Sequence, residues 1–598
     1  MPDAIHPALL YLFGALLVLF LPGRFRQVFA LAIPLLGLIN YSQLAEGIYW
    51  SIPLLDFELV LGRVDRWSLI YLSIFTILSF IGILYILNDN RKLDFSAGLL
   101  YAGSAMGVVL AGDLLTLFLF WEMLTLAAVL CILTRGTPEA GKAAYRYLLV
   151  HVFGGVILLA GIVLHLATGG SIAFDKIELK GVGAWLMFLG FGINCAWPVV
   201  GAWLTDTYPH ASHGGLIFMA TYTTKTAVYV LARCFPGEEV LLYIGIVLAV
   251  VPLLYAVIEN DLRRVLAYAL INQVGFMVIA IGLGTPLSLN GAAAHSYCHI
   301  LYKALLFMAM GSVLYRTGKT KATELGGLYR SMPLTCLFAC LGAASMAFPY
   351  FCGFVSKSMI MSAAASQQTT LTTCVWLALL FGSIGAFQQA GIKVPFFAFF
   401  SKDSGLRCEE APGNQLLAMA ITAILCIFVG SFPNAYLYQM LPNPEASYQP
   451  YTVAHVTDQF ALLLFCGLAF VLLIRSGLYP AEIRATNVDF DWLYRRGGSL
   501  VYRAFDKSLN ATNSGVKKFV VGGVVKHVVN FFESGASRFA AWILTPVWML
   551  AGYSPEKIED SRQSLFKRSK RGAFPIGITT FCAVVLLGLL SLIVLLGK

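Results

Sequence analysis

Residues 114–134 read LLTLFLFWEMLTLAAVLCILT, a run in which Glu122 is the one charged residue. A helix needs about 20 apolar residues to cross the hydrocarbon core of a bilayer, and this run is long enough. Similar runs recur along the 598 residues, of which 59% are hydrophobic and only 12% are charged. Soluble globular chains carry about 25% charged residues, so this chain cannot cover itself with a water-facing surface. The sequence therefore predicts an all-α membrane protein.

The apolar runs predict about sixteen transmembrane helices. Their approximate ranges are 7–22, 27–44, 67–88, 95–112, 114–134, 144–168, 183–206, 213–234, 239–259, 263–285, 291–315, 332–365, 371–400, 414–437, 456–474 and 574–597. Loops with Lys and Arg follow the first, third, fifth, ninth and eleventh runs. The positive-inside rule places these loops in the cytoplasm, and both termini then face outward.

Two of these runs contain residues that interrupt helices. Residues 332–365 are too many for one straight helix and include Pro349, and residues 183–206 include Pro198. The tripeptide Ala-Trp-Pro that ends at Pro198 recurs as the Ala-Phe-Pro that ends at Pro349. Transporters built from inverted repeats carry broken helices at corresponding points of their two halves. We therefore predict two broken helices in two inverted repeats.

The chain is divided accordingly. The predicted parts are N-terminal transmembrane helices at 1–94, a first repeat at 95–234, a second repeat at 239–400, further transmembrane helices at 401–475, a basic lateral segment at 476–573 and a final transmembrane helix at 574–598.

The lateral segment differs in composition from the rest of the chain. Residues 475–571 hold 16 Lys or Arg against 8 Asp or Glu, with aliphatic and aromatic residues between them. This mixture predicts an amphipathic segment on the cytoplasmic membrane surface, in contact with lipid headgroups. Gly522, Gly535 and Pro546 predict several short helical pieces, because glycine and proline weaken helices. The alternative is a basic linker that is partly disordered.

Charged residues inside the apolar runs are the first candidate functional groups. Glu122 lies about a third of the way along its run, and Lys225 lies in the middle of residues 213–234. Such groups are costly in a membrane and are usually functional. A buried ammonium pairs with a carboxylate or loses its proton, so Glu122 and Lys225 are predicted to interact directly or through one water. The alternatives are a glutamate that only fixes packing and a lysine that snorkels to an interface.

Three further ionisable residues occupy one helical stripe, because His295, His299 and Lys303 follow one another at intervals of four. Imidazole titrates near neutrality and both gives and takes a proton, so the stripe is a candidate proton wire. The alternative is a pair of hydrogen-bonded packing histidines. Lys357 lies just past the break at Pro349, where a lysine can control proton release; the alternative is an ordinary lysine at a helix end. Lys393 is ambiguous, with snorkelling as the default.

The sequence points to no metal or cofactor site. The twelve cysteines form no C-x-x-C pair, and no carboxylate accompanies the histidine stripe. No nucleotide-binding loop and no soluble catalytic domain is recognisable. We therefore expect no metal, no cofactor, no disulfide framework and no nucleic-acid partner.

Several short motifs carry a family resemblance over roughly residues 65–400. They are Trp121-Glu122, Trp203-Leu204-Thr205-Asp206, Asp261-Leu262-Arg263-Arg264-Val265-Leu266-Ala267-Tyr268, Asn272-Gln273-Val274-Gly275, His299-Ile300-Leu301-Tyr302-Lys303-Ala304-Leu305-Leu306-Phe307, Leu325-Gly326-Gly327-Leu328 and Gly353-Phe354-Val355-Ser356-Lys357. In their order and spacing the chain resembles the antiporter-like membrane subunits shared by respiratory complex I and the multisubunit Mrp-type cation/proton antiporters. It looks most similar to the Mrp D subunit, with a C-terminal extension like the lateral helix of other family members.

The resemblance implies roles for the candidate residues. The family's fifth-span glutamate falls on Glu122, its eighth-span lysine on Lys225 and its twelfth-span lysine on Lys357. Its histidine and lysine cluster falls on the 295–303 stripe. The family's seventh-span lysine falls on Asn194, which cannot titrate. Either Lys225 becomes the direct partner of Glu122, or Asn194 holds a water or a cation.

The sequence thus predicts a proton-translocating subunit of a multisubunit Na⁺/proton antiporter in the cell inner membrane, and not an enzyme. Its expected partners are other subunits of the complex, lipids, protons and a cation, with Na⁺ as the expected one. The alternatives are a proton-channel subunit that energises a redox or inorganic-carbon-uptake complex, and a scaffold that has lost pumping.

Overall fold

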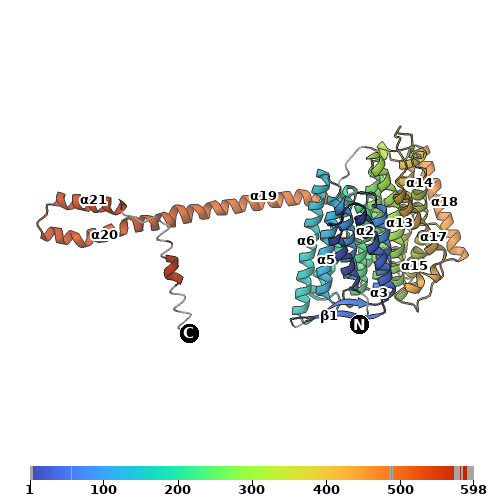
Figure 1. Cartoon of the computed structure of the whole chain (residues 1–598), viewed down its shortest axis with the longest axis horizontal. Coiled ribbons are helices and arrows are strands. Elements are labelled where there is room, and N and C mark those ends of the chain that lie inside the picture. Colours follow the sequence, from blue (N-terminus) through green and yellow to red (C-terminus); the bar gives the residue numbers. More distant parts are fainter. Residues whose placement is uncertain are drawn as a thin grey trace. The chain divides into compact units, whose positions relative to one another are not determined.

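The structure is a computed structural model of the whole chain (Figure 1). It describes residues 5–55, 57–89, 91–480, 482–483, 487, 489–571, 580 and 583–588. The chain divides into two compact units, residues 1–492 and residues 493–598, and each is described by itself.

The first unit is a helical bundle with one small β-hairpin. Its first half contains α1 (Pro7–Leu17), α2 (Gly23–Ser42), β1 (Gly47–Leu54), β2 (Phe57–Val64), α3 (Arg66–Tyr85), α4 (Lys92–Leu110), α5 (Leu114–Leu133), α6 (Pro138–Ala167), α7 (Gly181–Asn194), α8 (Ala202–Thr207), α9 (Gly215–Thr221) and α10 (Thr223–Cys234). Its second half contains α11 (Val240–Ile258), α12 (Leu262–Leu283), α13 (Pro286–Thr317), α14 (Pro333–Ala344), α15 (Cys352–Ser366), α16 (Thr370–Ala386) with the π-helical η4 (Phe387–Lys393) and η5 (Phe396–Phe400), α17 (Gly413–Ser431) and α18 (Val453–Arg475).

These elements account for the first fifteen predicted spans. Eleven helices of the described residues are long and apolar enough to cross a membrane, and the shorter apolar helices α1, α7 and α14 fall on further predicted spans. The all-α membrane fold is therefore confirmed. The sixteenth predicted span, 574–597, lies almost wholly outside the described residues.

Both predicted helix breaks are present. The chain leaves helical geometry between α7 and α8 and again between α14 and α15, and the two breaks contain Pro198 and Pro349. Ala196, Val199 and Tyr350 have φ angles of 57°, 72° and 68°, in the left-handed region that non-glycine residues rarely adopt. The surrounding helices therefore hold both breaks in a strained conformation.

The eighth span is also interrupted, which the sequence did not predict. α9 ends at Thr221 and α10 begins at Thr223, with no proline or glycine between them. The sequence carries no local signal for this interruption. Next to this interruption, the carbonyl of Ala220 accepts a hydrogen bond from the side chain of Lys225.

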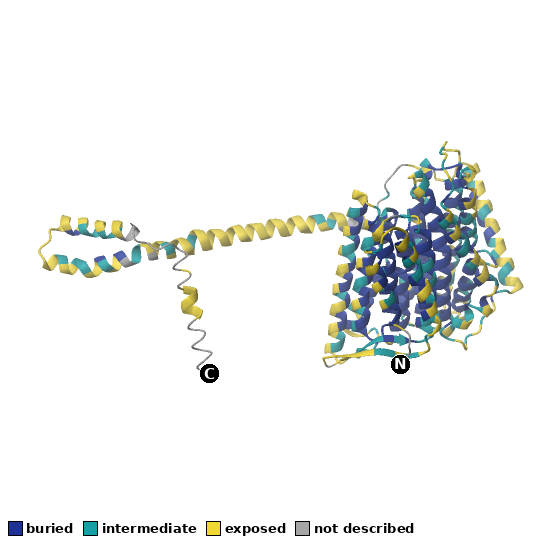
Figure 2. Ribbon diagram, in the orientation of Figure 1, coloured by how far each residue is buried: buried dark blue, intermediate teal, exposed yellow. Residues whose placement is uncertain are grey.

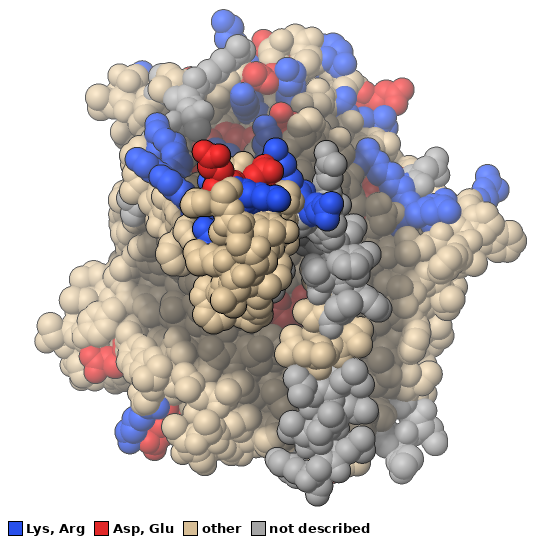
Figure 3. Space-filling model, turned by 90° about the vertical axis from the view of Figure 1, so that its left-hand side faces the viewer, with Lys and Arg blue, Asp and Glu red and all other residues tan. Residues whose placement is uncertain are grey.

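The basic loops of the bundle lie together. Arg91 donates to the carbonyl of Thr134, and Arg135 and Arg263 both donate to the carbonyl of Pro209. The amide of Leu262 donates to the carbonyl of Thr320. These contacts join the loops that follow odd-numbered spans, as the orientation requires, and we call this end of the bundle the basic end. Figure 3 shows that broad areas of the surface carry almost no charged side chains.

Burial locates the centre of the bundle. α12 and α13 are almost wholly buried, whereas α18 is mostly exposed. Figure 2 shows this as a dark interior surrounded by helices with exposed outer faces. Side chains on α12 and α13 therefore face other helices and not lipid.

The second unit is helical and largely exposed. α19 (Phe490–Lys517) begins in the first unit and runs without interruption into η8 (Lys518–Val525) and α20 (Lys526–Leu550), and α21 (Pro555–Arg571) packs back against α20. The prediction of several short pieces was wrong for residues 490–550. Gly522 marks only a π-helical stretch, because a helix accepts a glycine at a cost of about 1 kcal/mol.

The exposed apolar side chains of this unit recur at helical spacing. Val501, Phe505 and Leu509 are each more than half exposed and follow one another at intervals of four residues. Such a stripe opposite a basic face is typical of a helix that lies in a membrane interface or against another protein. Placement on the cytoplasmic surface stays a prediction.

Cysteine labelling tests that placement. We expect cysteines introduced at Lys518 and Lys567 to react with a membrane-impermeant maleimide only from the cytoplasm, because residues 539–553 are too few to span a bilayer. The measurement is labelling in right-side-out and inside-out vesicles, with the parent protein as the control for native cysteines. Labelling of the cysteine at 567 from outside would show that residues 539–553 cross the membrane.

Candidate functional site

A row of buried ionisable side chains lies within the bundle. Lys225 on α10, the stripe residues His295, His299 and Lys303 on α13, and Lys357 on α15 are each at most 4% exposed. α10 and α15 both pack against α13. Among the described residues, no ion pair includes any of the five. The centre of the bundle therefore holds lysines and histidines that have no carboxylate partner in the described part of the chain.

Lys225 is bound by the interruption in its own span. Its Nζ atom donates to the carbonyl oxygen of Ala220 at 2.7 Å and to Oγ1 of Thr224 at 3.1 Å. The Ala220 carbonyl lies one residue before the end of α9. An interrupted helix offers carbonyls that a continuous helix would use internally, so the break supplies the acceptor for the buried ammonium.

Glu122 faces a different neighbour from the one predicted. Its Oε1 atom is buried and has no hydrogen-bond partner in the described part of the chain. The carboxylate lies against Gly155 of α6, where a Cβ atom would come within 2.0 Å of Oε1. No ion pair joins Glu122 to Lys225, so the direct contact that was predicted does not form in this structure. The interaction through one water stays a prediction.

The histidine stripe connects three helices. His295 on α13 shares a hydrogen bond of 2.9 Å between Nδ1 and Oγ of Ser356 on α15. Its Nε2 lies 3.2 Å from Oε1 of Gln273 on α12, which also accepts from the hydroxyl of Tyr302 at 3.0 Å. The ring of His299 lies 5.9 Å from the ring of His295, centre to centre. The hydrogen bonds of His295 join α12 and α15 through α13, whereas neither ring nitrogen of His299 has a hydrogen-bond partner among the described residues.

The two lysines that flank this path are held weakly. Lys303 donates to the carbonyl of Leu266 on α12 at 3.2 Å. Lys357 has no hydrogen-bond partner among the described residues, and its Nζ lies 5.6 Å from the ring centre of Phe276. A cation at that distance from an aromatic ring gains only about 1 kcal/mol. Neither lysine is therefore fixed in the charged form by a strong partner.

Asn194 is the last residue of α7, immediately before the break. It is 1% exposed, and neither its Oδ1 nor its Nδ2 has a hydrogen-bond partner in the described residues. Trp203 donates through Nε1 to the carbonyl of the preceding Ile193 at 2.9 Å. The expectation that Asn194 holds a water or a cation stays a prediction, and the unpaired amide is compatible with it.

Lys393 is not a snorkelling lysine. It is fully buried, and its Nζ donates to the carbonyls of Ala256, Val257 and Glu259 at the end of α11, at 3.1, 2.8 and 2.9 Å. The same atom lies 2.8 Å from Oε1 of Glu482, which follows α18. Lys393 thus satisfies the last carbonyls of one helix and ties the segment before α19 to the bundle.

Sequence reasoning missed two polar features. His151 on α6 is buried, donates through Nδ1 to the carbonyl of Tyr147, and has no partner at Nε2 among the described residues. A histidine inside an apolar run was the signal that could have found it. Arg146 binds both oxygens of Asp206 through Nε and Nη2 at 2.6 and 2.9 Å, a pair that spans 60 residues and has no local signal.

The comparisons with known proteins agree with this arrangement. The profile of the family described as NADH:quinone oxidoreductase/Mrp antiporter, TM matches residues 111–384. The NAD(P)H-quinone oxidoreductase chain 4 1 of Synechococcus elongatus is 31% identical over 423 residues, which are 66% of this chain and 78% of that protein. The chain belongs to this family of membrane subunits.

Other matches vary in extent. A protein of Alkalihalophilus pseudofirmus that is named as an Na(+)/H(+) antiporter subunit, of the type designated A, is 27% identical over 446 residues, or 65% of this chain and 55% of that protein. The chain spans about half the length of the first curated relatives it matches, between 46% and 58%. One chain in the structure of the Mrp complex from Dietzia sp. has the same fold, with a TM-score of 0.72 and 23% identity over 87% of this chain and 62% of that chain. The predicted family is thus confirmed, while the antiporter relative is named as the A type and not as the D type.

The Lys393–Glu482 pair gives a stability prediction. Lys393→Met leaves a nearly buried carboxylate without its cation, and loss of one partner of such a pair costs about 3–5 kcal/mol. We expect the apparent Tm of the purified protein in detergent to fall, and Lys393→Met with Glu482→Gln to recover a large part of that loss. A double variant no more stable than Lys393→Met would contradict the pairing.

Proposed function

We propose that the chain is a proton-translocating subunit of a multisubunit monovalent-cation/proton antiporter in the cell inner membrane, with the other subunits of that complex as its partners. The observation that carries the proposal is the row of buried lysines and histidines that runs from α10 through α13 to α15. This row has the residue types, the burial and the flanking helix breaks that proton transfer through a membrane requires.

Electrostatic repulsion drives the transfer in this proposal, because a positive charge on one member of the row disfavours protonation of the next. In a low-dielectric interior, two cations a few ångströms apart cost several kcal/mol if no anion lies between them. Protonation of Lys225 therefore disfavours protonation of the 295–303 stripe, and release from Lys357 favours it. A proton that enters the row near Glu122 moves stepwise toward Lys357 as each neighbour gives up its charge.

The hydrogen bonds of the row run to neighbouring polar groups, and none of them joins two of its members among the described residues. His295 bridges Ser356 and Gln273, so a proton that reaches either ring nitrogen has a bonded neighbour on α15 or α12. Lys225 and Lys303 are bonded to single carbonyls and a hydroxyl, which bind an ammonium without holding it permanently charged. Water between these groups completes the path in the proposal.

The coupled ion is proposed from the relatives. The match to a protein named as an Na(+)/H(+) antiporter component supports Na⁺ as the cation handled by the complex. The alternative is a subunit whose proton flow energises a redox or carbon-uptake complex, and the match to a protein named as an NAD(P)H-quinone oxidoreductase chain favours its redox form. Exchange driven by added Na⁺ distinguishes the two.

Replacement of Glu122 tests the proposal. We expect Glu122→Gln to reduce cation/proton exchange to background, because the amide keeps the shape of the side chain but cannot carry a proton. The measurement is the collapse of a pH gradient on addition of Na⁺ to inverted vesicles that contain the complex, with subunit content checked on the same vesicles. Near-normal exchange by the assembled variant would show that Glu122 only fixes the packing of its helix.

Gly155 offers a test that leaves the carboxylate in place. We expect Gly155→Ala to lower the exchange rate at least about tenfold, because its Cβ atom would lie 2.0 Å from Oε1 of Glu122 and displace it. Gly154→Ala is the matched control, since its nearest contact is Ile193 Cγ2 at 3.3 Å. Equal exchange by the two variants would show that the position of the Glu122 carboxylate does not matter.

A further inference from the structure

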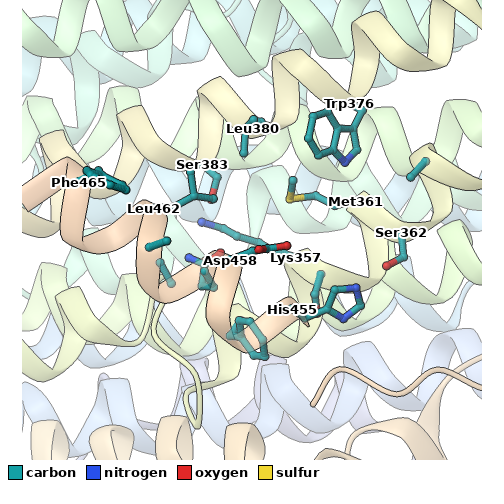
Figure 4. A pocket seen from close by; sticks show the side chains of 16 residues that line it. Lys357, Met361, Ser362, Trp376, Leu380, Ser383, His455, Asp458, Leu462 and Phe465 are labelled. Atoms are coloured by element: carbon teal, nitrogen blue, oxygen red, sulfur yellow. The ribbon is translucent and has the colours of Figure 1, made fainter. Parts of the chain in front are cut away.

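A cavity of 570 Å³ lies beside Lys357, between α15, α16 and α18. Figure 4 shows the side chains that line it, with His455 and Asp458 projecting from α18. The cavity is large enough for many water molecules, and its lining includes polar groups from α15 and α18 that water can bind. The last residue of the central row therefore borders a large opening.

The titratable lining residues of this cavity come from two helices. Lys357 comes from α15, while His455 and Asp458 come from the first two turns of α18. From α16 the lining residues are Trp376, Leu380 and Ser383, none of which carries a charge. Beyond the lining, the Tyr448 ring lies 6.3 Å from the His455 ring.

Three observations indicate that these groups communicate through water. Lys357 is 4% exposed and has no hydrogen-bond partner among the described residues. The Nδ1 atom of His455 is buried and likewise unpartnered in that part of the chain. No ion pair within 4 Å joins Lys357 to Asp458, although both border the same cavity. Asp458, which is exposed, therefore borders the same cavity as Lys357 without forming an ion pair with it.

The direction in which α18 runs shows at which end of the bundle its first turns lie. α18 ends at Arg475 and leads toward the segment that is bound at the end of α11, next to the basic loops. Its first turns therefore lie at the other end of the bundle, where Asn443 accepts and donates hydrogen bonds with Asn290 near the start of α13. The positive-inside rule makes that end the outer one.

We propose that Asp458 and His455 form the outer proton-exchange site of this subunit, and that α18 is thereby part of its proton path. The ammonium of Lys357 gives a proton to water in the cavity, and the carboxylate or the neutral imidazole takes one up and passes it to the outside. Only O–H and N–H bonds form and break, and the total charge is conserved. The proposal rests on the proposed function and extends the path beyond both predicted repeats.

The carboxylate acts on Lys357 in two ways. The negative charge of Asp458 stabilises the protonated form of Lys357. Protonation of Asp458 from the outside removes that stabilisation. The site thus senses outer pH. While Asp458 is ionised, Lys357 thus retains its proton, and protonation of Asp458 from the outside favours release.

A chemical probe tests the cavity without relying on transport. In the assembled complex, we expect a cysteine at Lys357 (Lys357→Cys) to react from the outside with small methanethiosulfonate reagents, faster with a cationic than with an anionic one. Asp458→Asn in that background should lower the cation-to-anion ratio of rates roughly fivefold, because one negative charge is lost from the lining of the same cavity. Glu445→Gln is the matched control, since Glu445 is an exposed carboxylate before α18 that does not border the cavity.

Transport then tests the role. With Lys357 intact, Asp458→Asn and His455→Gln should each lower the exchange rate and shift its dependence on outer pH, while the dependence on inner pH stays as in the parent. Absence of outside labelling at 357, or an unchanged rate ratio with Asp458→Asn, would overturn the assignment of the cavity. If the parent complex exchanges protons and both variants keep its dependence on outer pH, the role of α18 is overturned. If the parent complex moves no protons, the proposed function is overturned instead.

Discussion

A cation buried in a membrane-spanning bundle must find a hydrogen-bond acceptor or give up its proton, and the arrangement of this protein depends on that constraint. Its central lysines have no carboxylate partners among the described residues, and two of the three bind neutral acceptors. Lys225 binds the carbonyl of Ala220 and Lys303 binds that of Leu266. Such acceptors tolerate both the ammonium and the amine, which is the property that a proton path needs.

The helix breaks follow from the same constraint. A continuous helix uses its carbonyls internally, whereas an interrupted one has acceptors to spare. The interruption before Thr223 supplies the acceptor for Lys225, and the break that precedes α15 allows Lys357 to border a cavity. Carboxylates with strong partners lie elsewhere: Asp206 binds Arg146, and Glu482 binds Lys393. Fixed ion pairs thus join helices outside the central row, and the row itself has no ion pair among the described residues.

Features that depend on a short stretch of chain were predictable from the sequence. The lengths of the apolar runs gave fifteen spans that the structure describes, because the thickness of the bilayer sets the length of each helix. Pro198 and Pro349 marked two breaks, because proline removes a backbone donor wherever it stands. The central positions of Lys225 and the 295–303 stripe were visible for the same local reason, since a charge within an apolar run is conspicuous.

The partners of those residues were decided only by the tertiary structure. Glu122 turns toward Gly155 and not toward Lys225, His295 meets Ser356 from 61 residues away, and Lys393 is buried against the end of α11. Each outcome depends on how a helix is rotated about its axis and which helices pack beside it. The sequence by itself determined which residues would lie within apolar helices. Their partners were settled by packing between helices distant in the chain, since hydropathy and spacing within one run carry no information about the neighbouring helix.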